Sequence, residues 1–322
     1  MKIGIVGGTG NISTSIVRLL VKQRHEVVCF NRGQRGQPPA GGRVIVGDRA
    51  NAAEFERVMQ QEKFDAAIDM ICFNAEQAQR SLRAFRGVRQ FVHCSTVCTY
   101  GIKYDWLPAT EEHPLRPISD YGRNKVAADE VYGEAYRREG FPVTIIKPST
   151  TYGPQLGMLR QVAWDFSWID RVRKGKPILV CNDGRARHQF LHVDDAALGF
   201  AGVLGNAQCL GQTYNLMRPE HISWADYHRL AMQVLGREVK LISVPLAALD
   251  ADRFSICNSI FAYDCYYSPA KLQRDVPEFQ PVVSLADGMR QVIEVMDREQ
   301  RIPDSDRETW EDALIAGSPT AS

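Results

Sequence analysis

Short runs of hydrophobic residues alternate along the first half of the chain with longer stretches in which apolar and polar positions follow a helical period. The runs that end in glycine, proline or polar residues predict strands near residues 2–7, 26–30, 43–46, 65–71, 90–95 and 143–148. The periodic stretches predict helices near residues 12–23, 51–62, 75–86 and 121–138. Because strands and helices alternate, the sequence predicts an α/β fold with a parallel sheet covered on both faces.

The pattern changes in the second half of the chain. From Gln155 the alternation loosens, and aromatic residues cluster at Trp164, Phe166 and Trp168. No internal repeat is visible in the sequence. At 322 residues the chain is long enough for one large core and a smaller lobe.

A glycine-rich turn connects the first predicted strand to the first predicted helix. Its sequence is Gly7-Gly8-Thr9-Gly10-Asn11-Ile12-Ser13. Glycines at such a turn let the backbone approach a pyrophosphate, which rests on the helix N-terminus. This predicts dinucleotide binding, with an ordinary βα turn as the alternative. Ser13 replaces the third glycine of the usual pattern and is small enough for close helix–strand packing. The cofactor-binding candidates in this turn are Gly7, Thr9, Gly10, Asn11 and Ile12.

Tyr121 and Lys125 lie four residues apart in the fourth predicted helix, so both side chains project from one helix face. An ammonium near a phenol stabilises the phenolate and lowers the phenol pKa from about 10. That shift makes the phenol usable as an acid/base near neutral pH. A solvated helix face is the alternative for such a pair when no other motif accompanies it.

Two further predicted strands end in residues suited to a site. One strand end is Cys94-Ser95-Thr96-Val97-Cys98-Thr99-Tyr100-Gly101. The other is Ile145-Ile146-Lys147-Pro148-Ser149-Thr150-Thr151-Tyr152-Gly153-Pro154, which runs into a Pro/Gly loop. Strand ends are where an α/β sheet presents its chemistry. A hydroxyl from the first segment could therefore hydrogen-bond a substrate oxygen beside the phenol.

Together these segments resemble the extended short-chain dehydrogenase/reductase family, in its NAD-dependent epimerase/dehydratase branch, over about the first 300 residues. A further shared segment, Phe190-Leu191-His192-Val193-Asp194-Asp195, is similar to the family's Phe-Ile-His-Val-x-Asp. The resemblance implies that Thr96 positions a sugar hydroxyl and that Tyr121 exchanges its proton. It implies that Lys125 lowers the tyrosine pKa and holds the nicotinamide ribose. Pro148 would contact the cofactor, and Thr151 the substrate.

The resemblance also implies a Rossmann-type doubly wound parallel sheet with a smaller, interleaved substrate lobe. The dinucleotide-binding domain would comprise residues 1–153 and about 187–217, and the lobe about 154–186 and 218–315. Residues 317–322 are expected to form a frayed tail. The helices near 75–86 and 121–138 would pair across a two-fold axis as a four-helix bundle, so a homodimer is expected.

The residues after the second predicted strand bear on the choice of cofactor. In NAD-selective sheets of this type an Asp or Glu about 20 residues past the glycines binds the ribose 2′-hydroxyl. Asn31 stands there instead, and Arg32 follows. A guanidinium suits a 2′-phosphate, so we expect NAD(P), with NADP favoured over NAD. Stacking of Arg32 on adenine and a solvated loop are the alternatives. Asp48 resembles the family residue that contacts the adenine.

Cys98 departs from the family's sugar dehydratases, in which the two residues after the catalytic threonine are acidic. Val97 and Cys98 stand there, so a 4,6-dehydratase is not expected. The position of Cys98 resembles that of the acid/base thiol in the family's sugar 3,5-epimerases, and a thiol pKa near 8.5 can be tuned toward neutrality. Cys98 is therefore a candidate acid/base, with a buried packing thiol as the alternative. Arg160 is the nearest basic residue to the place of those epimerases' companion lysine.

Arg187 is a candidate contact for the substrate. The family's arginine for the nucleotide diphosphate lies four residues before the His of the His-Val motif. His188 holds that place, with Arg187 one residue away and Arg185 nearby. A solvated loop is the alternative, which leaves open whether the substrate is linked to a nucleotide.

Composition adds few constraints. The formal net charge of +1 gives no general case for a nucleic-acid or membrane partner, and no apolar run approaches the roughly 20 residues of a membrane span. Met1 leads straight into the first strand, so we expect no cleaved signal. The eight cysteines form no C-x-x-C pair, so we expect reduced thiols in a cytoplasmic protein, without disulfides or a metal site.

These observations predict an NAD(P)-dependent enzyme that modifies a sugar or nucleotide sugar, foremost an epimerase working through a transient ketone. The first alternative is a dehydrogenase/reductase that releases its cofactor after each turnover. The second is a non-catalytic RNA-binding protein, because the Asn-Arg-Gly after the second strand resembles chloroplast RNA-binding relatives of the family. The presence of Thr96, Tyr121 and Lys125 and the lack of a basic stripe argue against that second alternative.

Overall fold

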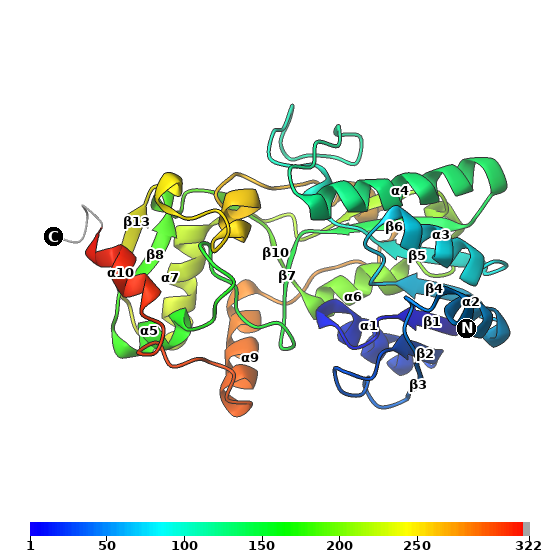
Figure 1. The fold of residues 1–322 in the computed structure, drawn as a ribbon, viewed down its shortest axis with the longest axis horizontal. Helices are drawn as coiled ribbons and strands as arrows, with labels where there is room; N and C mark the ends of the chain where they lie inside the picture. The colour runs from blue at the N-terminus through cyan, green and yellow to red at the C-terminus, as the bar shows by residue number, and fades with distance from the viewer. Residues whose placement is uncertain (318–322) are drawn as a thin grey trace. The chain divides into compact units, whose positions relative to one another are not determined.

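The computed structural model describes residues 1–317 and divides them into two compact units (Figure 1). The first unit comprises Met1–Thr151, Val193–Arg218 and Tyr267–Val282. The second comprises Tyr152–His192, Pro219–Tyr266 and residues 283–317. The tail expected at 317–322 lies, from residue 318 onward, outside the described residues.

A seven-stranded parallel sheet forms the centre of the first unit. Its strands are β1 (Lys2–Val6), β2 (Glu26–Asn31), β3 (Gly42–Val46), β4 (Ala66–Asp69), β5 (Gln90–Cys94), β6 (Val143–Pro148) and β11 (Thr213–Leu216). Their order is β11-β6-β5-β4-β1-β2-β3, and every neighbouring pair is parallel. The strand order reverses between β1 and β4, and ligands bind at the carboxyl edge of such a switch point.

Helices cover both faces of this sheet (Figure 1). On one side α1 (Asn11–Lys22) packs against α6 (Val193–Gly202). On the other, α3 (Ala75–Ala84) packs between α2 (Ala52–Glu62) and α4 (Asp120–Glu139). Every residue of β5 and β6 is buried, as expected of strands covered on both faces.

A chain of aromatic contacts ties the second helical layer to the sheet. Phe30 of β2 packs against Phe55 of α2, with ring centroids 5.1 Å apart. Phe91 of β5 likewise contacts Phe85 at 5.4 Å and Tyr132 of α4 at 5.2 Å. Edge-on and tilted ring pairs of this kind add to the stabilisation from burial alone, so α2, α3 and α4 are held on one common core.

The predicted α/β class and Rossmann-type parallel sheet are confirmed. All six predicted strands and all four predicted helices are present. Their ends differ from the prediction by no more than two residues, as at β4, where 65–71 was expected and Ala66–Asp69 is observed. The seventh strand, β11, was anticipated only as a return of the chain to the sheet around 187–217.

Two segments lie in a different unit from the one expected. Residues 187–192 belong to the second unit, and Tyr267–Val282 belongs to the first. The second difference has a clear cause in polar contacts. Lys271 Nζ donates to the carbonyl of Thr213 in β11 at 3.0 Å, and the Val282 N–H donates to Asp195 of α6 at 2.9 Å. The segment, with its helix α8 (Ala270–Asp275), therefore closes the β11 side of the sheet domain.

The described residues of the second unit include two small sheets that lie wholly within it and four α-helices. β8 (Ile178–Cys181) pairs in parallel with β13 (Leu241–Val244), and β9 (Arg187–His188) pairs antiparallel with β12 (Ile222–Ser223). The helices are α5 (Trp168–Lys174), α7 (Trp224–Leu235), α9 (Leu285–Arg298) and α10 (Trp310–Ala316). Its other elements include β7 (Thr150–Tyr152), which crosses the unit boundary, and β10 (Phe190–His192). Two 3₁₀ turns, at Asn182–Gly184 and Leu246–Ala248, and a π-helical turn at Cys257–Phe261 also belong to it.

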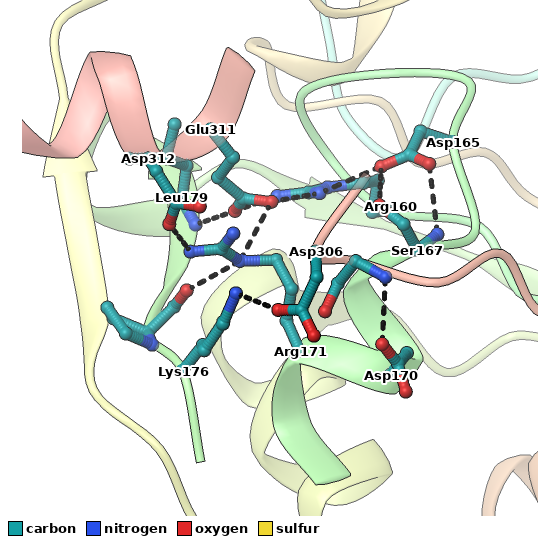
Figure 2. A network of polar contacts seen from close by, with 12 residues as sticks. Arg160, Asp165, Ser167, Asp170, Arg171, Lys176, Leu179, Asp306, Glu311 and Asp312 are labelled. Carbon is teal, nitrogen blue, oxygen red and sulfur yellow. Dashed lines mark hydrogen bonds and ion pairs between the residues drawn. The ribbon is translucent and has the colours of Figure 1, made fainter. Parts of the chain in front are cut away.

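Buried charges fix the last helix onto the second unit (Figure 2). Arg160 donates to both carboxylate oxygens of Glu311 in α10, at 2.8 and 2.5 Å. The Leu179 N–H donates to the same carboxylate at 2.7 Å, and Arg171 lies 3.3 Å from it. Buried charges are tolerated when they are paired and hydrogen-bonded, so this network links β8 and α5 to α10.

Within residues 1–317, no helix combines the length and apolar character that a membrane crossing requires.

Candidate active site

Thr96 is held in a short turn at the carboxyl end of β5. The turn is the 3₁₀ helix η1 (Val97–Thr99), and the Thr96 hydroxyl caps it by accepting from the Cys98 N–H at 3.2 Å. The Thr99 hydroxyl donates back to the Thr96 carbonyl at 2.9 Å. Two hydrogen bonds therefore fix the backbone and the hydroxyl of Thr96 at the edge where parallel sheets bind ligands.

A glycine lets the helix that carries Tyr121 approach this turn. α4 begins where the Ser119 hydroxyl accepts from the Gly122 N–H. A Cβ on Gly122 would lie 2.7 Å from the Cys98 carbonyl oxygen, a separation too short for a real contact. Only glycine at this position lets α4 rest on η1, and the close approach brings Tyr121 and Thr96 together.

Lys125 is buried one turn further along α4. Its ammonium donates to the carbonyls of Cys72 and Cys94, at 2.7 Å in each case. It lies 5.0 Å from the ring centroid of Phe73 and 5.9 Å from that of Tyr121. Two carbonyls and two aromatic faces thus hold the cation between the ends of β4 and β5.

The lowering of the Tyr121 pKa that the Tyr-x-x-x-Lys spacing predicted is not present in this structure. The Tyr121 side chain is partly exposed, but its pKa is raised above the usual value, first by desolvation and then by the nearby thiols of Cys94 and Cys98. A hydrogen bond with Thr96 opposes the rise without reversing it. The physical reason is that the Lys125 ammonium donates to backbone carbonyls rather than to the phenol oxygen. The phenol is therefore protonated at neutral pH.

Cys98 lies at the same strand end, but its surroundings do not favour a thiolate. Burial raises the pKa of the Cys98 thiol, and a hydrogen bond with Thr96 offsets this only in part. Arg160, the nearest basic residue in the sequence, is buried in the second unit and bound to Glu311. The expectation of a thiol tuned toward neutrality is thus not met, and the alternative of a packing thiol gains support.

The glycine-rich turn has the shape needed for a close approach of backbone and phosphate. A Cβ on Gly8 would lie 2.4 Å from the sulfur of Cys29, so the turn can pack on β2 only with glycine there. Ser13, in place of the third glycine, accepts from the Gly10 N–H at 2.7 Å and thereby closes the turn. The first turn of α1 carries no acidic residue, which suits an anion at the helix N-terminus.

A cavity of about 480 Å³ opens beside this turn, at the carboxyl ends of β1, β2 and β3. Six expected cofactor residues line it, namely Gly7, Thr9, Gly10, Asn31, Arg32 and Asp48. Arg35, Ile71 and Phe73 also line it and were not predicted. Ile71 and Phe73 follow β4, so the strand-end rule could have found them, whereas Arg35 lies in a loop without a motif.

Two buried side-chain amide atoms at this edge lack partners among residues 1–317. Asn31 Oδ1 accepts from the Gly8 N–H at 2.8 Å, but Asn31 Nδ2 is buried with no hydrogen-bond partner there. Asn11 Oδ1, at the start of α1, is in the same condition. Buried polar atoms are nearly always satisfied, and ribose hydroxyls and phosphates would supply what these two lack. The residues present thus fit a nicotinamide dinucleotide.

Two of the four arginines that line the cavity are already engaged. Arg49 is buried and paired with Asp69 at 3.0 Å, and Arg80 pairs with Glu76. Arg32 and Arg35 are exposed, and within the described part of the chain no ion pair is formed by either. Two free guanidiniums therefore face the cavity from the loop after β2.

The other predicted residues are distributed as follows. Pro148 closes β6, and Thr151 lies in β7 at the end of the first unit. Ile12 is the second residue of α1. Arg187 belongs to the second unit, where its N–H donates to Asp264 at 2.8 Å and its side chain is exposed.

The strand order, the glycine turn at the switch point and the side chains at the end of β5 are those of a Rossmann-type, dinucleotide-dependent enzyme. Comparison with known proteins identifies the family. Residues 3–216 match the NAD dependent epimerase/dehydratase family. The chain belongs to this family of the extended short-chain dehydrogenases/reductases and is an NAD-dependent enzyme of the epimerase, dehydratase or reductase type, so the resemblance drawn from its motifs is confirmed.

Individual relatives carry several different activities. The chain is 29% identical over 283 residues to 2′-dehydrokanamycin reductase of Streptomyces kanamyceticus, covering 87% of this chain and 80% of that protein. It is 30% identical over 237 residues to the chloroplast stem-loop binding protein of 41 kDa b of Arabidopsis thaliana, covering 69% and 60%. Among solved structures, UDP-glucose 4-epimerase of Thermotoga maritima, with UDP-glucose, shares its fold at a TM-score of 0.77 and 17% identity, covering 93% of this chain and all of that one.

Proposed function

We propose that this chain is an NADP(H)-dependent oxidoreductase that interconverts a ketone and a secondary alcohol on a carbohydrate, releasing the cofactor after each turnover. The observation that carries the proposal is the close contact of α4 with η1, which brings Tyr121 beside Thr96 at the carboxyl end of β5. A protonated phenol and a fixed hydroxyl at one point are suited to binding and protonating one substrate oxygen.

In this proposal Tyr121 is the acid/base. When bound, the nicotinamide supplies or accepts the hydride at the carbinol carbon. The phenol is protonated at neutral pH, so it can donate its proton to a ketone oxygen as that oxygen gains negative charge. The Thr96 hydroxyl hydrogen-bonds the same oxygen and fixes its orientation.

Lys125 has a supporting role that differs from a direct hydrogen bond to the phenol. Two of its three N–H bonds are directed at the Cys72 and Cys94 carbonyls, which leaves one donor for a ribose hydroxyl. Its charge also lies close enough to the Tyr121 ring to stabilise the phenolate after the proton has left.

The preference for NADP rests on the loop after β2. An acidic residue that would bind the 2′-hydroxyl of NAD is replaced by Asn31, whose Nδ2 remains available as a donor. Arg32 and Arg35 both line the same cavity. Guanidinium groups bind phosphate in bidentate geometry, so the pair suits the extra phosphate of NADP.

Two observations bear on the choice between net redox turnover and epimerisation. Burial raises the pKa of the Cys98 thiol, which argues against inversion of a carbon beside the ketone. In addition, one relative, which matches 87% of this chain at 29% identity, is a 2′-dehydrokanamycin reductase. The substrate class we propose is therefore a sugar ketone, with or without a nucleotide.

An epimerase is the second candidate. Inversion at the oxidised carbon itself requires only oxidation, rotation of the ketone and reduction on its other face, for which Thr96, Tyr121 and Lys125 suffice. The similarity to a stem-loop binding protein keeps a third possibility, RNA binding, within the test below.

The test is a cofactor balance with purified protein. NADPH or NADH would be incubated with keto-aminoglycosides and with keto-sugars in free and nucleotide-linked form, and both NADPH consumption and sugar products would be measured. We expect the amount of cofactor consumed to equal the amount of alcohol formed. The reaction should be at least about tenfold more efficient with NADPH than with NADH, a difference of about 1.4 kcal/mol. Inversion without net cofactor change would overturn the proposal in favour of the epimerase. Binding of an RNA stem-loop without cofactor binding would overturn both.

A further inference from the structure

We propose that Asp129 and Lys147 form a buried charge pair that holds Tyr121 and Thr96 in register, and that both are positioning residues for the reaction. This inference rests on the proposed function for its kinetic readout. Asp129 lies in α4 and Lys147 in β6, so the pair joins the helix that carries the acid/base to the strand beside β5.

Asp129 contacts the strand end directly before Thr96. It follows Lys125 by four residues and Tyr121 by eight, so the three side chains share one helix face. Asp129 Oδ2 accepts from the Ser95 hydroxyl at 2.9 Å and from Lys147 Nζ at 2.5 Å. The carboxylate thus ties α4 to the residue that precedes Thr96.

Lys147 reaches the other side of Thr96 through a second hydroxyl. Its Nζ donates to Thr99 Oγ1 at 2.8 Å, and that hydroxyl donates to the Thr96 carbonyl at 2.9 Å. The ammonium also lies 5.4 Å from the ring centroid of Tyr100. The hydroxyls of Ser95 and Thr99, one on each side of Thr96, are therefore oriented by one carboxylate and one ammonium.

The pair is charged and shielded from solvent. Both side chains are buried, as are Ser95 and Thr99. Burial alone would raise the pKa of Asp129, but the Lys147 charge and the interaction with His93, 3.2 Å away, outweigh it and bring the pKa to about 2. A buried ion pair is seldom more stabilising than well-packed apolar side chains. The geometry that the pair imposes on Thr96 is a better reason for its presence than stability.

A matched control exists at the opposite ends of the same two strands. Gln90 of β5 donates to Thr144 of β6 at 3.2 Å, and the Thr144 hydroxyl donates to the Cys209 carbonyl at 2.8 Å. Both side chains are buried. Thr144→Val removes a buried polar link between β5 and β6 without touching the segment around Thr96.

The first experiment uses the double variant Asp129→Asn/Lys147→Met, which keeps side-chain size and leaves no unpaired buried charge. With the protein and its reducible sugar, kcat should fall about 10²-fold, the loss expected from a small misplacement of reacting groups. The KM and the NADPH dissociation constant should stay within about threefold. Amide hydrogen exchange at residues 95–101 should become faster, because this turn would lose its anchors. Thr144→Val should change neither kcat nor that exchange.

A second variant covers the case in which the double variant does not fold. Thr99→Val keeps the charge pair intact and removes only the link from Lys147 to the Thr96 carbonyl, so kcat should fall and exchange at 95–101 should rise. Thr99→Ser keeps a hydroxyl at this position, so kcat and the exchange rate at 95–101 should both stay close to the wild-type values. Unchanged exchange in Thr99→Val, or a kcat within threefold of wild type, would overturn the inference. If no sugar is turned over by the wild-type protein, the proposed function fails, and the exchange measurement still decides this inference.

Discussion

At the scale of single residues, the environment of Tyr121 decides the direction of its chemistry. The spacing from Lys125 predicted a phenol with a lowered pKa, but desolvation raises the pKa and the ammonium donates to carbonyls. A phenol that holds its proton is better suited to giving it to a ketone than to taking one from an alcohol.

Tyr121→Phe tests the acid/base role directly. Only the hydroxyl is lost, so kcat should fall by about 10²–10⁴-fold, the usual contribution of a general acid, while NADPH affinity stays nearly unchanged. Tyr136→Phe is the matched control, since Tyr136 lies in the same helix with an exposed ring. A Tyr121→Phe protein that keeps more than about a third of the rate, with hydride transfer rate-limiting, would rule out the assignment.

Cys98→Ser separates a packing thiol from a second acid/base. The substitution nearly preserves the side-chain volume and raises the group's pKa too far for acid/base chemistry near neutral pH. Because burial already keeps the thiol neutral, turnover should stay within about threefold, well short of a general-base loss. Solvent deuterium should not enter the sugar beside the carbonyl in either protein. Deuterium incorporation that disappears in Cys98→Ser would instead identify Cys98 as a catalytic base.

At the scale of elements, the loop after β2 sets the cofactor preference. Arg32→Ala and Arg35→Ala should each weaken NADPH binding by about tenfold, equivalent to one charged phosphate contact of about 1.4 kcal/mol. NADH binding should not change, because it lacks the phosphate. Arg86→Ala, an exposed arginine that does not line the cavity, serves as control. Equal losses for both cofactors would indicate stacking on adenine, and no loss would indicate a solvated loop.

Helix α7 makes the second unit sensitive to acid. His228 is buried against Trp168 at 5.1 Å, and neither ring nitrogen has a hydrogen-bond partner within residues 1–317. Burial, with the nearby Arg160 charge, lowers the pKa of His228 to about 3. The unfolded chain binds this proton near pH 6.5, so the contribution to stability is complete above pH 6.5. It is lost as the pH falls toward 3, by up to about 1.4 kcal/mol per pH unit.

His228→Phe should therefore flatten the dependence of the melting temperature on pH between 6.5 and 4. Phenylalanine keeps the ring contacts and cannot bind a proton. His221→Phe, at an exposed position of the same unit, should leave the slope as it is in the wild type. Calorimetry at several pH values measures both, and an unchanged slope in His228→Phe would contradict the buried neutral histidine.

At the scale of the whole molecule, the sheet domain could be predicted from sequence because its signals are local. Each strand and helix up to residue 148 has its own hydrophobic pattern, and the ends of β5 and β6 carry recognisable motifs. The segment Tyr267–Val282 has no such signal. It joins the first unit through single long-range contacts, such as Lys271 with Thr213, which no periodicity records.

The candidate site, like the sheet domain, could be predicted from sequence only where its signals are local. Residue types and spacing were enough to select Thr96, Tyr121, Lys125 and the glycine turn. What they omit is where each polar group is directed. These directions depend on atoms from three or four elements. Examples are the carbonyl partners of Lys125, the hydrogen bond from the Gly8 N–H to the Asn31 amide oxygen, and the charge pair that contacts Ser95 and Thr99. The sign of a pKa shift follows from those partners, which is why the lowered pKa expected of Tyr121 from its spacing to Lys125 is not found.

Assembly is the remaining prediction at this scale, and it rests on α3 and α4. We expect an isologous dimer in which these helices pair with their copies, the commonest arrangement of soluble oligomers. Their exposed side chains include Glu76 and Arg83 on α3 and Arg123, Glu130 and Glu134 on α4. Because both charge signs are present, charge pairs across a two-fold axis would contribute to such a dimer. The dimer should then weaken as salt screens them.

Light scattering at micromolar concentration should give about twice the chain mass of 36.2 kDa at low salt, decreasing toward the monomer value at about 1 M salt. Ala127→Glu, between the charged positions of α4, should favour the monomer. Val46→Glu adds the same charge at an exposed position of β3, away from both helices, and should leave the mass unchanged. A monomer at low salt would refute the dimer. A dimer that persists in Ala127→Glu would place the two-fold contact on another face.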